Sequence, residues 1–163
     1  MPRSAPDAAV TLSVLDRLID AEPRNSSEAP ATRAQSVRML RDAVRRDLEW
    51  LLNTRQVAFP PPEGLRELNR SVYVYGLPDF TGYGLSSAAA EARLTRQLQS
   101  ALKFFEPRLA KVKVVPVEPL ASKTRAFRFR IEALLMMDPA PEHISFDTVL
   151  QLTTNQYEVR DAG

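Results

Sequence analysis

The apolar residues of this chain recur with a helical period in its first two thirds and alternate with polar residues in its last third. From about residue 35 to residue 52 they follow one another at intervals of three or four, the spacing of one helix face. A second such segment begins after Ser86 or Ser87, either of which could cap a helix. It ends near Glu106, because Pro107 cannot occupy a helix interior. The pattern predicts two main helices. Their apolar positions are Val37, Leu40, Val44, Leu48 and Leu51 in the first, and Leu94, Leu98, Ala101, Leu102 and Phe105 in the second.

A shorter apolar stripe precedes the first main helix. It predicts about two helical turns, too few to be stable without docking on another surface. Residues 21–31 contain Pro23, Pro30 and two serines and are typical of a linker. We therefore expect residues 1–34 to form a flexible N-terminal segment with a short helix that docks on its own domain or on a partner. The stripe consists of Leu12, Leu15, Leu18 and Ile19.

The segment between the two main helices is predicted to be irregular. Residues 53–64 contain three consecutive prolines, which cannot continue a helix, and they read as an exposed loop. Residues 71–81 begin with a short β-like run and then turn at Gly76 and Pro78.

Strict alternation in the last third predicts half-buried strands. Val112 and Val114 begin the series, residues 127–135 continue it, and residues 144–152 complete it. The connection at residues 138–141 is short enough for an antiparallel pair. We predict an α+β fold in which a small antiparallel sheet of about three to four strands packs against two main helices. The single domain is expected at residues 35–155, with residues 156–163 as a C-terminal tail.

Composition excludes several classes of function. The 163 residues are 44% hydrophobic and 26% charged, with a net charge of +2, which does not favour nucleic acid as a partner. The chain has no cysteine and a single histidine, His143, so we expect no disulfide, metal centre or other cofactor. No apolar run approaches the ~18 residues of a membrane span, and the first residues lack the order of a signal peptide. A cytoplasmic protein without direct membrane insertion is expected.

Candidate catalytic groups are few. Hydrolysis of a glycan requires two carboxylates across the substrate, and Asp79, Glu106 and Asp147 are the available candidates. Surface solvation explains each of them. Gly82-Tyr83-Gly84 lacks the lysine and the spacing of a phosphate-binding loop. We therefore predict that the protein is not an enzyme.

Five segments, taken in order, resemble TssE proteins, the baseplate wedge subunits of type VI secretion systems. Any one match would be weak, but the series extends from residue 13 to residue 150. The segments are SVLDRLI (13–19), RRDLEWLLNTR (45–55), VYGLPDFT (74–81), FFEPRL (104–109) and FDTVL (146–150).

The resemblance implies a structural protein of a contractile injection machine. Its expected partners are the wedge proteins TssF, TssG and TssK, and the sheath proteins TssB and TssC, whose assembly would begin on an edge of the sheet. Some relatives carry the label "lysozyme-like", so a peptidoglycan hydrolase is the alternative.

The Glu-Pro-Arg signature of that family corresponds to Glu106, Pro107 and Arg108. Pro107 separates the predicted helix from the predicted strand and fixes two opposite charges at a corner. One interpretation is an internal ion pair at the helix end. The resemblance implies instead that Arg108 contacts a wedge partner through its planar donor fork. The sequence predicts partner-binding residues at this corner and along the Leu12, Leu15, Leu18 and Ile19 stripe.

Overall fold

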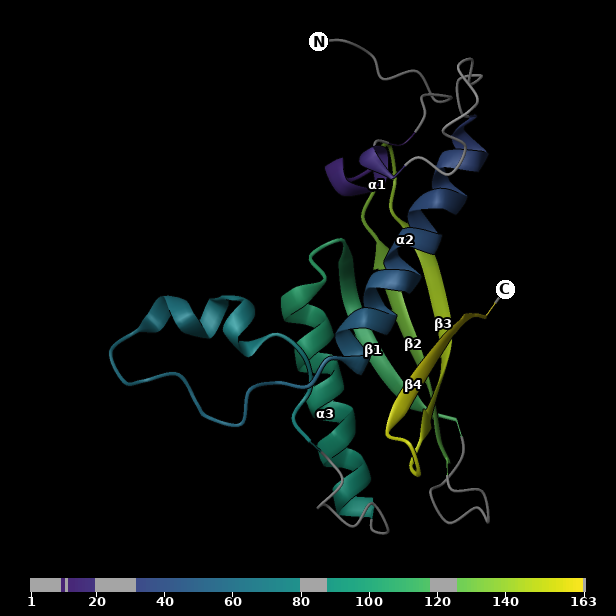
Figure 1. The fold of residues 1–163 in the computed structure, drawn as a ribbon. Coiled ribbons are helices and arrows are strands. Elements are labelled where there is room, and N and C mark those ends of the chain that lie inside the picture. The colour runs from purple at the N-terminus through teal and green to yellow at the C-terminus, as the bar shows by residue number, and fades with distance from the viewer. Residues whose placement is uncertain (1–9, 11, 20–31, 80–87, 118–125, 163) are drawn as a thin grey trace.

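A computed structural model describes residues 10, 12–19, 32–79, 88–117 and 126–162. Figure 1 shows a sheet with two long helices lying against it and a loop that projects to one side. No helix in the described ranges is both long and apolar enough to cross a membrane. In chain order the elements are α1 (Val14–Leu18), α2 (Arg33–Asn53), the 3-10 helices η1 (Arg66–Arg70) and η2 (Val72–Val74), α3 (Ala88–Phe105), β1 (Leu109–Pro116), β2 (Ala126–Leu135), β3 (Glu142–Gln151) and β4 (Gln156–Asp161).

The sheet is antiparallel and follows chain order, β1-β2-β3-β4. One face is buried because α3 packs against β1 and α2 packs against β4. Alternate residues of β2 and β3 point into this core, as the sequence pattern predicts. The predicted α+β class and the short N-terminal helix are therefore confirmed. The largest buried side chains of the sheet are Phe127, Phe129, Ile131, Leu135, Phe146 and Leu150.

The ends of the main helices follow from local chemistry. Thr32 caps α2 and forms a capping box with Gln35, so the helix begins two residues before the predicted start. α3 ends at Phe105, where Pro107 requires it to end. The caps expected at Ser86 and Ser87 lie outside the described residues.

The predicted C-terminal tail is wrong over residues 156–161, which form β4. Tyr157 and Val159 alternate with polar residues and are buried against α2 and β3. Asn155 adopts a positive φ of 53° in the turn that reverses the chain into this strand. The alternation was too short to stand out in the sequence, and tertiary contacts with α2 complete it.

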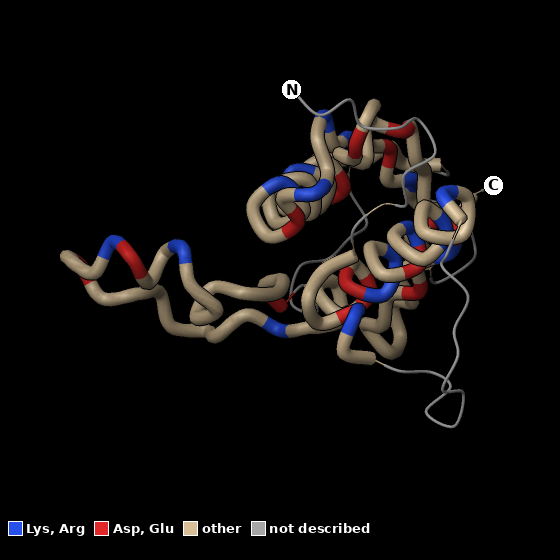
Figure 2. The backbone as a smooth tube through the Cα atoms, turned by 90° about the horizontal axis from the view of Figure 1, so that it is seen from above, with Lys and Arg blue, Asp and Glu red and all other residues tan. Residues whose placement is uncertain are grey.

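The segment between α2 and α3 also departs from the prediction. The expected β-like run at residue 71 is replaced by η1 and η2, which lie on a loop projecting from the body (Figures 1 and 2). We call residues 56–75 the arm. Its base is closed by two backbone hydrogen bonds of 2.9 Å, from Gln56 N to Leu77 O and from Leu77 N to Thr54 O.

Candidate partner-binding surfaces

The Glu106-Pro107-Arg108 corner lies where α3 ends and β1 begins. Arg108 donates from Nε to Glu106 Oε1 at 2.6 Å and from Nη2 to Glu106 Oε2 at 2.5 Å. Nη2 also donates to Asp47 Oδ2 of α2 at 2.6 Å. Glu106 is 4% exposed, so its charge depends on the arginine for compensation. The fork of Arg108 therefore ties the α3–β1 corner to α2.

The charged network continues from α2 to α1. Arg46 donates from Nη2 to Asp47 Oδ1 at 2.8 Å and to Asp16 Oδ1 of α1 at 2.7 Å. Its guanidinium also lies 4.9 Å from the ring centroid of Trp50. We call Asp16, Arg46, Asp47, Glu106 and Arg108 the corner network. It connects three elements that are far apart in the sequence.

The network shifts the pKa values of Arg108 and Asp16. The hydrogen bond with Glu106, helped by Asp47, raises the pKa of Arg108 although burial opposes this. Burial acts to raise the pKa of Asp16, but hydrogen bonds from Ser13 and Arg46 outweigh it and lower the pKa overall. These groups therefore hold their charges more firmly than isolated side chains do.

The structure places Arg108 in the internal ion pair that was one of the two interpretations of the sequence. Its side chain is 24% exposed, so the arginine is not fully enclosed by the fold. Nη1 makes no hydrogen bond with the described part of the chain. Contact of this corner with a partner remains a prediction.

The predicted docking stripe around α1 is partly packed against the domain and partly exposed to solvent. Leu12 packs against the core, and the Val10 N–H donates to Ser36 Oγ at 2.9 Å. Leu15, Leu18 and Ile19 are 55%, 76% and 53% exposed. Since α1 is anchored through Asp16 and Leu12, it presents these three apolar residues outward. They form an apolar surface next to the corner network.

The two edges of the sheet differ. At the β4 edge, the Asn53 side chain donates to Tyr157 O at 2.9 Å and accepts from Tyr157 N at 2.9 Å, so it occupies the place of a neighbouring peptide. At the β1 edge, Val117 N–H points toward β2, to Arg128 O at 3.0 Å. Peptide groups alternate in direction along an antiparallel strand, so Val114, three residues before Val117, points its N–H away from β2, whereas the bulge between Ala110 and Lys113 interrupts the alternation nearer the start of the strand.

The three candidate carboxylates of a hydrolase lie in separate places, each paired with arginine. Glu106 binds Arg108, Asp79 lies 2.7 Å from Arg55 at the arm base, and Asp147 lies 2.7 Å from Arg130 on the uncovered face of the sheet. The described residues also contain no cluster of three or more side chains suited to a metal ion. This arrangement does not resemble the paired carboxylates of a glycosidase.

Sequence reasoning missed three contributors to these surfaces: Asp47, Arg46 and Asn53. A signal existed for Asp47, which lies three residues after Val44 and four before Leu51 and therefore flanks the buried stripe of α2. A charge at such a position indicates a partner in the fold. Nothing local distinguishes Asn53, because its partner Tyr157 is 104 residues away.

Comparison with known proteins identifies the family. The chain matches the family described as "Baseplate wedge protein gp25" over residues 38–140, a range that contains Asp47 and the Glu106–Arg108 corner. It is also similar to the anti-adapter protein IraD of Escherichia coli strain UTI89, with 30% identity over 122 residues that cover 75% of this chain and 84% of IraD. IraD of strain E2348/69 is 32% identical over the same length. The family suggested by the five sequence segments is confirmed, and the chain belongs to the baseplate wedge protein gp25 family.

Proposed function

We propose that this chain is the TssE-like wedge subunit of a type VI secretion baseplate, acting in the cytoplasm as a structural protein. The observation that carries the proposal is the match to the baseplate wedge family over residues 38–140, from within α2 to the connection that follows β2. The intact corner network supports it, because the signature residues of the TssE resemblance meet in one charged cluster.

The proposed wedge contact is the combined surface of α1 and the corner. Asp16 of α1 binds Arg46, and Arg46 shares Asp47 with Arg108. The outward apolar residues of α1 are therefore coupled to the corner through one chain of ion pairs. An apolar patch bordered by fixed charges is the usual composition of a protein interface. We assign TssF, TssG and TssK to this surface.

The proposed sheath contact is the outer edge of β1. Strand addition requires outward-pointing peptide groups such as that of Val114, whereas Asn53 already occupies part of the β4 edge. Lys111, at a positive φ of 52°, and Pro116 border the open stretch and limit it to a short strand. A strand from TssB or TssC is the proposed occupant.

The wedge contact is tested by co-expression with TssF and TssG. Replacing two outward residues of α1, Leu15→Asp with Leu18→Asp, should remove the chain from the complex while its melting temperature stays close to that of the wild type. Val72→Asp, a change at an exposed residue of the arm, is the control and should co-purify normally. Failure of the wild-type chain to co-purify would contradict the wedge assignment itself.

The sheath contact is tested separately. Val114→Pro removes an outward N–H without removing a ladder hydrogen bond, and edge strands tolerate this change. It should retain TssF and TssG but fail to start sheath assembly. Val159→Pro on β4 is the matched control, because Val159 is also buried, lies two residues from Tyr157 and points its N–H outward. Equal sheath assembly by both variants would contradict the β1 assignment.

A second candidate function is an anti-adapter role, favoured by the identity of 30% to proteins that carry this name. Such a protein would act without TssF or TssG. The same co-expression experiment therefore distinguishes the two candidates.

A further inference from the structure

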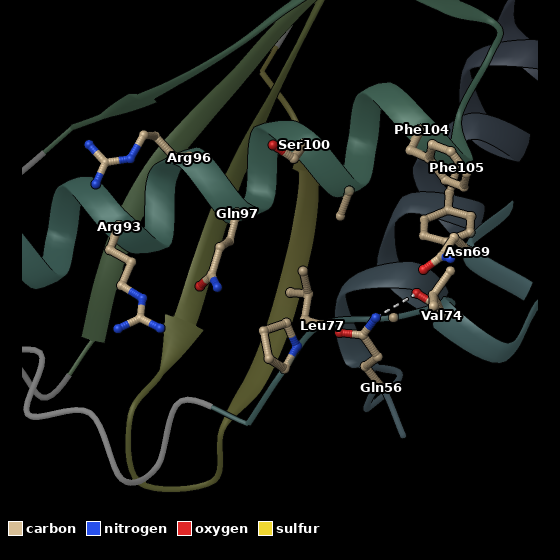
Figure 3. Close-up of a pocket in the computed structure, with 13 residues that line it drawn as sticks. Gln56, Asn69, Val74, Leu77, Arg93, Arg96, Gln97, Ser100, Phe104 and Phe105 are labelled. Carbon is tan, nitrogen blue, oxygen red and sulfur yellow. Dashed lines mark hydrogen bonds between the residues drawn. The ribbon is translucent and has the colours of Figure 1, made fainter. Parts of the chain in front are cut away.

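A groove separates the base of the arm from α3 (Figure 3). Its volume is about 430 Å³, and none of its described lining residues is acidic. Leu77 and Pro78 form one wall, and Ala101 and Phe104 lie on the opposite wall. Phe104 is 47% exposed, and its ring centroid lies 4.7 Å from that of Phe105. The groove therefore offers an apolar floor that is open to solvent.

The dimensions of the groove match an extended peptide. Its lining on α3 runs from Arg93 to Phe105, and twelve steps of about 1.5 Å give a length of about 18 Å. An extended chain advances about 3.3 Å per residue, so five or six residues fill this length.

Gln97 supplies a polar group for such a peptide. It projects from α3 on the side where Leu77 lies, as Figure 3 shows, and its Oε1 is buried and accepts no hydrogen bond from the described part of the chain. A buried acceptor without a donor is destabilising, so a donor from a ligand would be favourable. Asn53 shows in this same fold how a side-chain amide pairs with both groups of a peptide unit.

The positive charge at one end of the groove favours a ligand with an acidic residue. Arg93 and Arg96 lie at one end of it, where Figure 3 shows both side chains on α3. Arg96 makes no ion pair or hydrogen bond within the described residues, so its charge is available to a ligand. An acidic side chain at one end of the peptide and an apolar one over Phe104 would complement this surface.

We infer that this groove binds an extended segment of a partner protein, five or six residues long, with an acidic residue near Arg96 and an apolar residue over Phe104. Gln97 forms a hydrogen bond with the peptide backbone, and the base of the arm forms the second wall of the groove. The inference concerns a surface distinct from α1, the corner network and the β1 edge. It holds whether the chain serves a baseplate or acts as an anti-adapter.

The test uses the full chain and a phage-displayed library of random heptapeptides. Enriched peptides should combine an acidic residue with an apolar one, and a fluorescein-labelled copy should bind the chain in solution. Arg96→Glu should weaken that binding about tenfold or more, because it replaces attraction by repulsion. Gln99→Ala, on the same helix outside the groove, is the control and should bind like the wild type.

Gln97→Leu separates a ligand-binding role from a structural one. Removing an unpaired buried acceptor should keep or raise the melting temperature, whereas peptide binding should weaken about fivefold. A structural role would move both quantities in the same direction. The inference is overturned if no peptide is enriched or if the enriched peptides bind all variants equally. It is also overturned if the groove binds a second copy of this chain instead, or if single-stranded oligothymidine displaces the peptides.

Discussion

At the scale of single residues, the corner network concentrates charge in a poorly solvated place. We predict that Arg108→Ala destabilises the free chain, because it leaves Glu106 buried without its counter-charge. Breaking a buried pair costs about 3–5 kcal/mol, and the partial exposure of Arg108 reduces this to about 2–3 kcal/mol. For a chain of this size the melting temperature should fall by about 5–10 °C, which a thermal melt measures.

Two further variants serve as controls for Arg108→Ala. Arg130→Ala breaks a similarly close pair, 2.7 Å, whose side chains are 43% and 46% exposed, and it should leave the melting temperature unchanged. Arg108→Lys keeps the charge but not the planar fork, so its melting temperature should lie between those of the alanine variant and the wild type. If Arg108→Ala and Arg130→Ala melt alike, the corner network is not a stabilising cluster.

The sequence could predict one pair of the corner network. Glu106 and Arg108 are two residues apart across a proline, so their pairing is visible locally. Asp47 is 61 residues from Arg108 and Asp16 is 30 from Arg46, and only the packing of α1, α2 and α3 brings them together. Local patterns cannot specify such contacts, because they depend on how the elements cross.

Asp16 gives the attachment of α1 a pH dependence. Its pKa is lowered in the folded chain, so it stabilises the docked helix above its ordinary pKa of about 4 and loses this effect as the pH falls through the lowered value. Trp50, the only tryptophan, contacts Arg46 and reports the event through its fluorescence. Asp16→Asn should show at pH 7 the emission that the wild type reaches only in acid. Identical titrations of the two proteins would contradict this role.

At the scale of elements, the sequence pattern could predict the strands but not the conformation of the arm. Alternation in β2 and β3 continues for ten residues each, which leaves little ambiguity about which face is buried. The arm has no such period, and Val72 was read as part of a β-like run although it is exposed in a 3-10 turn. Its path is fixed by backbone hydrogen bonds at its base and by the packing of Tyr75 on Phe105, not by a periodic hydrophobic face.

Gly76 is the residue on which the arm base depends. It adopts a φ of 103°, and a Cβ built there would lie 2.4 Å from Thr54 O, the acceptor for Leu77 N. We predict that Gly76→Ala opens the arm base, lowers the melting temperature and weakens peptide binding in the groove. Gly64→Ala is the matched control, because Gly64 also has a positive φ, 91°, but faces open space. It carries only the backbone strain, about 1 kcal/mol. Hydrogen exchange at Gln56 and Leu77 distinguishes the variants, and equal exchange in both would contradict the prediction.

At the scale of the whole molecule, the proposed interfaces are distributed around one core. α1 and the corner lie beside α2, the open edge belongs to β1, and the groove follows α3. A subunit that joins several partners needs separate surfaces that a single rigid core holds in place. The boundary of that core determines how much of the chain such a scaffold requires.

The last prediction concerns this boundary. Removing residues 1–31 deletes α1 and its contacts through Leu12 and Asp16, and it should lower the melting temperature by a few degrees while unfolding stays cooperative. Removing residues 156–163 deletes β4 and with it the burial of Tyr157 and Val159, each of which contributes about 1.5–3 kcal/mol. It also leaves the Asn53 amide without its peptide partner and exposes the Leu150 side of β3. Because typical domains have only about 5–15 kcal/mol of stability, this second truncation should abolish cooperative unfolding or lower the midpoint by more than 10 °C. Thermal melts of both truncated chains beside the full chain decide the matter, and a β4 deletion that melts like the wild type would place the core boundary before residue 156 after all.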